Sequence, residues 1–279
     1  MRELFLLLTK SRRFMSGLVL FTLIMGFALI GPWFHQVNPF AMTGGLFYRP
    51  SDQFLLGTDN LGRDILSQLM HGTRTSMMIG LIAGGAATSI GVVIGSVAGF
   101  TGGLVDDILM GFTNILITIP PIVVLILLSV AVSVRSAVVM GIIIGVTSWP
   151  WTARAVRAQA TSLKEREHVD LARITGFNNV EMIVREILPY MFSYIFMVFI
   201  LQVTSGILSE ATLSMLGLGP FRTVSLGQML HWSLLWESVR VGAWWAFIPA
   251  VICLTTISFS LQTMNTGMDE VFNPKLRKD

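Results

Sequence analysis

The sequence contains no phosphate-binding loop, because the dipeptide Gly-Lys on which such a loop depends does not occur in its 279 residues. The chain therefore has no recognisable site for the phosphates of ATP. It also lacks the Gly-x-Ser-x-Gly turn of serine hydrolases. These absences argue against an enzyme, and they leave the chain without an evident energy source of its own.

Cysteine and histidine are scarce as well. The single cysteine, Cys253, lies in an apolar run, cannot form an internal disulfide and is expected to be buried. The four histidines, His35, His71, His168 and His231, lie far apart and show no metal-ligand spacing. We therefore expect no metal site and no cofactor on this chain.

Charged residues make up only 13% of the chain, whereas soluble domains carry about 25%. Hydrophobic residues make up 53%, and the mean hydropathy is +0.71. No basic cluster is interleaved with aromatic residues, which argues against a nucleic-acid partner. The composition indicates a protein that is embedded in membrane lipid.

Six apolar stretches are long enough to cross a bilayer as helices, which takes about 20 residues each. They are Phe14–Phe34, Met77–Phe100, Ile108–Val134, Ala137–Val156, Ile187–Leu216 and Ala243–Met264. We therefore predict an all-α, polytopic membrane protein with six transmembrane helices. We divide it into a first span with a polar cap segment, residues 1–76, and a transmembrane core, residues 77–279.

Positive charge sets the expected orientation, because Lys and Arg gather on the cytoplasmic side of membrane proteins. If the N-terminus is cytoplasmic, most of these residues lie on that side. They are Arg2, Lys10, Arg12, Arg13, Arg154, Arg157, Lys164, Arg166, Arg173, Arg185, Lys275, Arg277 and Lys278. We predict both termini and the polar stretch Ser162–Pro189 in the cytoplasm, and the cap segment outside.

Small residues recur along the second apolar stretch. Gly80 and Gly84, and again Gly91, Gly95 and Gly99, stand at four-residue spacing, which lets helices approach closely. We expect this stretch to be packed tightly inside a helix bundle.

Prolines and one acid stand out within the other spans. Pro120 and Pro121 should bend or interrupt the third span, as should Pro150 and Pro249 in the fourth and sixth. A broken helix lines a pathway in some transporters and is a simple kink in others. Glu210 is the only acid well inside a span; we favour a structural hydrogen bond over a proton or substrate role. Pro120, Pro121 and Glu210 are our candidates for a translocation path.

The stretch Ser162–Pro189 predicts two short helices set at an angle. Ser162 and Glu165 have the spacing of a capping box, and a helix from Leu163 to Thr175 would end at Gly176. A second helix would begin behind Asn178, with Glu181 completing its cap, and would meet Pro189. Such a pair is either a plain connector or a docking element for a partner.

Within this stretch, Asp170–Gly176 followed by Ile187–Pro189 resembles the EAA loop of permease subunits of bacterial ABC importers. In that family the loop docks into a cleft of the ATPase subunit. The resemblance therefore implies an ATPase-coupling role for a set of residues. They are Asp170, Leu171, Ala172, Arg173, Gly176 and Pro189.

A second set of motifs resembles the C-type permease of oligopeptide, dipeptide and nickel importers. The motifs are Leu56–Ser67, Gly72–Ser76, Glu210–Gly219 and Asn273–Arg277, and the resemblance covers essentially the whole chain. It implies the type I importer fold with six spans in a bacterial or archaeal cell membrane. It also implies a homologous second permease and two ATPase subunits or domains, which hold ATP and magnesium. An extracytoplasmic binding protein would deliver the substrate.

The resemblance implies import of short oligopeptides or oligosaccharides, since the segments after Gly219 and Gly267 are similar to members that import oligosaccharides. Nickel chelates are an alternative substrate. Arg63 and Asp64 are candidates for contact with the binding protein, with an internal ion pair as the alternative. Two other classes stay open. An ion-coupled transporter is disfavoured by the solitary Glu210, and a membrane scaffold or enzyme by the lack of a catalytic constellation.

Overall fold

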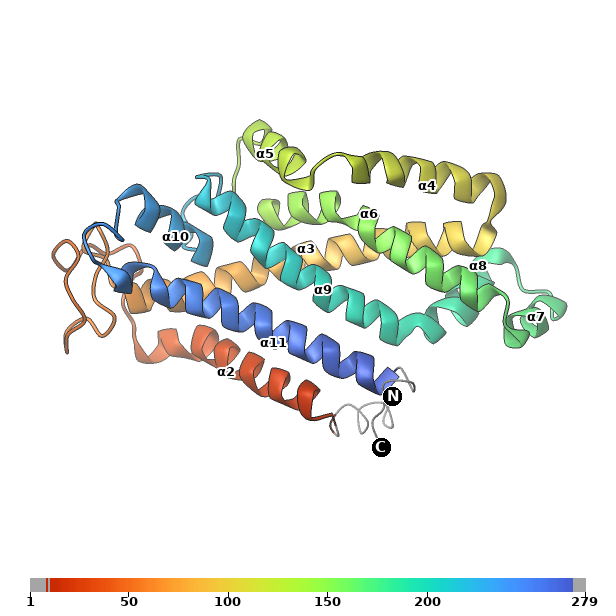
Figure 1. Ribbon diagram of the computed structural model, residues 1–279, viewed down its shortest axis with the longest axis horizontal. Coiled ribbons are helices and arrows are strands. Elements are labelled where there is room, and N and C mark those ends of the chain that lie inside the picture. The colour runs from red at the N-terminus through yellow and green to blue at the C-terminus, as the bar shows by residue number, and fades with distance from the viewer. Residues whose placement is uncertain (1–8, 10, 273–279) are drawn as a thin grey trace.

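The structure, a computed structural model, describes residue 9 and residues 11–272. Every regular element in these residues is a helix (Figure 1), which confirms the predicted all-α class. Five of the basic residues used to predict the orientation, Arg2, Lys10, Lys275, Arg277 and Lys278, lie outside the described residues.

Seven long helices form the body of the molecule. They are α2 (Arg12–Phe34), α3 (Ile65–Thr101), α4 (Gly103–Thr118), α5 (Pro121–Ala131), α6 (Ala137–Lys164), α9 (Leu188–Met215) and α11 (Ile248–Phe272). The short elements are α7 (Glu167–Ile174), α8 (Asn179–Met182), the π-helical turn η1 (Ile183–Ile187), α10 (Leu226–Leu235) and the 3-10 turn η2 (Trp244–Ala246).

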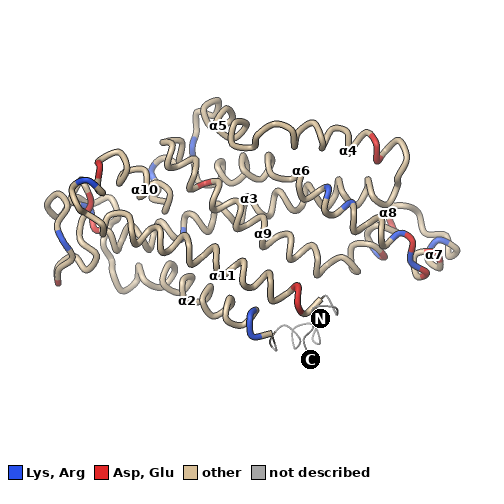
Figure 2. Tube along the Cα trace, in the orientation of Figure 1, with Lys and Arg blue, Asp and Glu red and all other residues tan. Residues whose placement is uncertain are grey.

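The bundle has two distinct ends (Figure 1). Residues 35–64 lie with α10 and η2 at one end, which we call the cap end. The short helices α7 and α8 lie at the other, which we call the tip end. Most charged residues sit at these two ends, whereas the middle of the bundle is almost free of them (Figure 2). This distribution is that of a protein whose middle lies in lipid.

Four helical segments are long and apolar enough to cross a membrane: α2, α3, Asn179–Met215 and Trp244–Phe272. The bent pair α4 and α5 makes a fifth if it counts as one span. The fourth expected span forms α6, which is 28 residues long. This helix carries two arginines and a lysine near its end, and it is not one of the four segments. The chain is thus a multi-pass membrane protein, and the expected count of six spans holds only approximately.

Helix α3 begins at Ile65 rather than at Met77, so the last part of the expected cap segment is helical. Its start is fixed by Asp64, whose side chain accepts a hydrogen bond from the backbone N–H of Ser67 at 2.7 Å. With 37 residues, α3 is about 55 Å long, well beyond the roughly 30 Å of the hydrocarbon core. Its first turns therefore belong to the cap end.

The prolines behave differently from one another. The chain breaks at Pro120, and α5 starts at Pro121 at an angle of 84° to α4, as predicted. Helix α6 runs through Pro150 without interruption. Pro249 lies in the first turn of α11, where the missing N–H costs nothing, so it does not interrupt that helix.

Glycines let α3 lie directly against its two neighbours, as predicted from their spacing. A Cβ atom on Gly91 would lie 2.5 Å from the side chain of Thr152 in α6. One on Gly84 would lie 2.6 Å from the side chain of Val203 in α9. Real Cβ atoms do not approach this closely, so these positions require glycine.

We predict that Gly91→Ala destabilises the protein by about 1–3 kcal/mol, because the added methyl group overlaps α6. Gly85→Ala is the matched control, since a Cβ atom there meets nothing within 4 Å. The thermal midpoint of the detergent-solubilised protein and its amount in membranes measure the difference. Equal behaviour of the two variants would contradict the packing described here.

Candidate functional site

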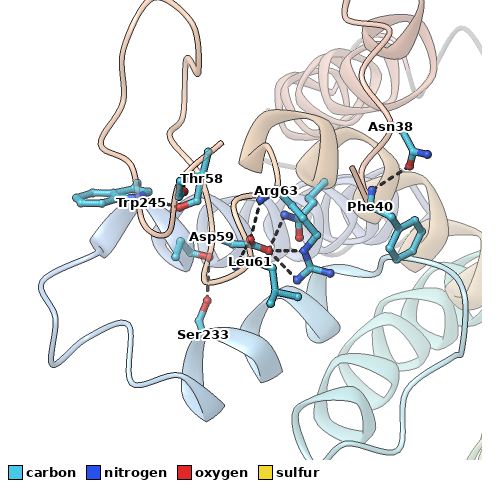
Figure 3. Close-up of polar contacts among 11 residues, drawn as sticks. Asn38, Phe40, Thr58, Asp59, Leu61, Arg63, Ser233 and Trp245 are labelled. Carbon is cyan, nitrogen blue, oxygen red and sulfur yellow. Dashed lines mark hydrogen bonds and ion pairs between the residues drawn. The ribbon is translucent and has the colours of Figure 1, made fainter. Parts of the chain in front are cut away.

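The cap segment is built around one buried carboxylate, that of Asp59 (Figure 3). Its Oδ2 accepts hydrogen bonds from Arg63 Nε at 2.7 Å and from Gln68 Nε2 at 2.9 Å. Its Oδ1 accepts from the backbone N–H groups of Leu61 and Arg63, both at 2.9 Å. The Arg63 guanidinium also lies 3.8 Å above the ring of Trp232 in α10. The cap segment, the start of α3 and α10 therefore form one rigid unit.

Arg63 and Asp64 lie inside this unit, with only 4% and 1% of their surfaces exposed. Asp64 contacts His35 Nε2 at 2.7 Å in addition to capping α3. Arg63 and Asp64 therefore do not pair with each other. Arg63 pairs with Asp59, and Asp64 contacts His35. Neither charge is available on the surface of this chain for a binding protein.

Glu210 is fully buried where three helices meet. Its carboxylate accepts hydrogen bonds from Ser76 Oγ of α3 at 2.9 Å and from Ser214 Oγ at 2.6 Å. Ser76 Oγ in turn accepts the backbone N–H of Leu226, the first residue of α10, at 3.1 Å. These contacts are the structural hydrogen bonds that we favoured from the sequence. A role of Glu210 in the translocation path stays a prediction. Pro120 and Pro121 are exposed at the break after α4, and their role in the path also stays a prediction.

The tip end differs in part from the expected helix pair. Helix α6 extends to Lys164 and contains Ser162, so the expected capping box with Glu165 does not form. The first short helix is instead α7, which is closed by Gly176 in the left-handed conformation at φ +90°. The second capping box is confirmed: Asn178 Oδ1 accepts from Glu181 N–H at 2.9 Å, and Asn178 N–H donates to Glu181 at 3.1 Å.

The two faces of α7 have opposite surroundings. Val169 and Ala172 are buried in a cluster with residues of α6, η1 and α9, so Ala172 does not face outward. Leu171 and Ile174 are exposed over 65% and 83% of their surfaces, and Val180 of α8 is exposed at the same end of the bundle. We call Leu171, Ile174 and Val180 the tip surface. Ile174 and Val180 did not stand out in the sequence. The pair Leu171 and Ile174 could have been found, because two apolar residues three positions apart lie on the same face of a short helix.

The remaining coupling candidates lie around this surface. Asp170 and Arg173 are exposed and pair with each other at 3.2 Å, and Gly176 is exposed at the turn. Pro189 lies in the first turn of α9. Because α8, η1 and α9 follow one another as a single helical segment, Asn179–Met215, helix α8 of the tip end is joined without a break to the helix that carries Glu210.

The described residues include no group of three or more His, Cys, Asp or Glu side chains that could hold a metal ion. A bundle of apolar helices with a folded cap at one end and an exposed apolar tip at the other is the architecture of a multi-pass membrane protein. Residues 91–270 match the family described as the inner membrane component of binding-protein-dependent transport systems. The chain belongs to this family.

Its relatives match over nearly the whole chain. It is 33% identical to the dipeptide transport system permease protein DppC of Bacillus subtilis over 97% of this chain and 84% of the relative. It is 34% identical to the oligopeptide transport system permease protein OppC of that organism, over 95% and 86%. A putative peptide transport system permease protein of Brucella abortus is 31% identical, over 98% and 91%. The resemblance to the C-type permeases is confirmed.

We predict that Asp59→Ala destabilises the cap by about 3–5 kcal/mol, because it leaves the guanidinium of Arg63 buried without a carboxylate. Asp52→Ala is the control, since Asp52 is an exposed acid of the same segment. Limited proteolysis within residues 35–64 should be much faster in the first variant only. Equal cleavage of both variants would show that Asp59 does not organise the cap.

Proposed function

We propose that this chain is a permease subunit of a binding-protein-dependent ABC importer, which moves short peptides into the cell with energy from ATP hydrolysis on partner subunits. The observation that carries the proposal is the exposed tip surface. Apolar side chains of α7 and α8 are exposed at the end of the bundle, and α8 is continuous with a span, in a chain without a phosphate-binding loop of its own. A surface of this kind fits a groove in another protein.

The tip surface would dock into the ATPase subunits, which bind ATP and magnesium. Leu171 and Ile174 would supply the apolar contact, and Asp170, Arg173 and Gly176 would lie at its edge. Ala172 and Pro189 would hold the shape of the tip, because the first is buried and the second begins α9. Helix α7 is joined to α8 through the turn at Gly176, and its Val169 and Ala172 pack with residues of η1. A movement of the docked tip would pass through these contacts into η1 and α9, which continue α8 without a loop.

The binding protein would dock at the cap end. Arg63 and Asp64 would act indirectly there, by shaping a surface on which Leu46, Tyr48 and Leu55 are exposed. A homologous second permease would complete the substrate pathway through the membrane. Each of the two chains would supply half of the residues that line it. The tip and the cap lie at opposite ends of the bundle and so face opposite sides of the membrane. The excess of Lys and Arg on the side of the tip and the termini supports placing these in the cytoplasm and the cap outside, in the cell inner membrane.

Peptides are the proposed substrate because the three relatives described above are all named as peptide, dipeptide or oligopeptide permeases. Oligosaccharides, suggested by the sequence after Gly219, and nickel chelates receive no support from those names. An ion-coupled transporter would need no ATPase, and the exposed tip would then have no partner.

We predict that Ile174→Glu lowers both uptake and ATPase co-purification at least tenfold, because it places a charge in an apolar contact at a cost above about 1.4 kcal/mol. The variant should fold normally, since the side chain is already exposed. Gly176→Glu is less informative because the positive φ at that position strains any side chain.

Ser162→Glu serves as the control, because it adds the same charge at the tip end but outside the tip surface. Unchanged uptake and unchanged ATPase binding in Ile174→Glu would overturn the coupling proposal.

The substrate proposal predicts that membrane vesicles containing the whole importer accumulate a labelled tetrapeptide in an ATP-dependent manner. A labelled trisaccharide and a nickel chelate serve as comparisons under the same conditions. Preferential uptake of either would replace peptides as the substrate, whereas uptake without ATP would point to an ion gradient.

A further inference from the structure

A pocket of about 280 Å³ lies between α4 and α6, in the half of the bundle toward the tip end. It is lined by Met110 and Asn114 of α4 and by Arg154, Arg157 and Ala158 of α6. Basic positions are visible along this part of α6, whereas the middle of the bundle is nearly uncharged (Figure 2). The proposed transport mechanism makes no use of this pocket.

The two arginines of the pocket have different surroundings. Arg157 forms a bidentate pair with Asp106 of α4, Nε to Oδ1 at 2.6 Å and Nη2 to Oδ2 at 2.5 Å. This pair neutralises Arg157 and fastens α4 to α6. Two further charges act on this pair, the negative charge of Asp107 and the positive charge of Lys164. Because their signs are opposite, they offset each other.

Arg154 is exposed and has no ion pair or hydrogen bond with any side chain that the structure describes. The side-chain amide of Asn114 is exposed on the facing helix. The pocket thus holds about one uncompensated positive charge together with a neutral hydrogen-bond donor. A ligand with one negative charge and several acceptor oxygens matches this arrangement.

The position along α6 places the pocket near one face of the membrane. Arg154 follows the start of the helix by about 25 Å, close to the thickness of the hydrocarbon core. Trp151, one turn earlier on the same face, is 60% exposed, and tryptophan gathers at the membrane–water boundary. Exposed apolar side chains lie on the same turns of α4 as the pocket and, along α6, about two to four turns before Arg154. They are Val138, Ile142 and Val146 of α6 and Ile108, Phe112 and Ile115 of α4.

We propose that this pocket binds the phosphate of an anionic phospholipid. The guanidinium of Arg154 and the amide of Asn114 donate hydrogen bonds to the phosphate oxygens, and the acyl chains lie along the apolar turns. Basic pockets between transmembrane helices on the cytoplasmic side take such headgroups, and the tip end is the side that we expect to be cytoplasmic. The site is independent of the transported substrate.

The carboxylate of a transported peptide is the competing occupant, because it would meet the same donors. The exposed apolar side chains on both helices favour lipid, since a peptide backbone would find few hydrogen-bond partners there. The two occupants predict different results in one experiment.

The experiment uses the whole importer in nanodiscs of phosphatidylcholine with a minor fraction of phosphatidylglycerol. Native mass spectrometry measures the retained phosphatidylglycerol. Arg154→Gln should lower retention about tenfold, as expected for loss of one charge-assisted contact. Arg154→Lys should keep most of the retention, because lysine also binds phosphate. Arg12→Gln, which removes an exposed arginine outside the pocket, should match the unmodified protein.

Asn114→Leu is a second variant that leaves every charge in place, and it should lower retention several-fold. Only assembled complexes are compared, so a folding defect cannot imitate lipid loss. Equal phosphatidylglycerol retention with and without Arg154 overturns the proposal. If Arg154→Gln instead weakens peptide uptake while the lipid stays bound, the pocket belongs to the substrate.

Discussion

The close packing of α3 against α6 and α9 is the constraint on which the rest of the structure depends. Gly84 brings α3 against α9, and Gly91 and Gly99 bring it against α6, at distances that admit no Cβ atom. In lipid, such contacts replace the hydrophobic driving force that packs helices in water. Helix α3 runs from the cap end toward the tip end. Because α6 and α9 both pack against it, the three helices keep the two ends in a fixed relation.

Helix α9 links the ends in a second way. Near the cap end, Glu210 accepts a hydrogen bond from Ser76 of α3, and Ser76 in turn accepts one from the backbone N–H of Leu226 of α10, so α9, α3 and α10 are linked there. At the tip end, α9 continues through a π-helical turn into α8, and π-helical turns occur often at functional sites. The tip is therefore joined directly to α9 through η1 and to α6 through the start of α7, whereas the cap and the start of α3 are held together at the other end.

Some local signals and the glycine spacing of α3 were read correctly, whereas the Ser162 cap, the start of α3 and the inward face of α7 were not. The cap of Asn178 and the end of α7 at Gly176 involve neighbouring residues alone, and both formed as predicted. The start of α3 was missed because its first turns are polar, and only burial in the cap shows them to be helical. Which face of α7 turns inward could not be predicted, since Val169 with Ala172 and Leu171 with Ile174 are both apolar pairs.

Two arginines show why the surroundings of a charge matter more than its sequence motif. Arg63 belongs to the most specific motif of the chain, yet Asp59 and Trp232 enclose it, and a buried charge with such partners serves the shape of the cap. Arg154 belongs to no motif that we recognised, yet it is exposed beside a pocket without an acidic partner among the described side chains. The acid of the pocket's other arginine, Asp106, is already paired with Arg157. Any counter-charge for Arg154 therefore comes from outside the described side chains, and an anionic headgroup is the source that we propose.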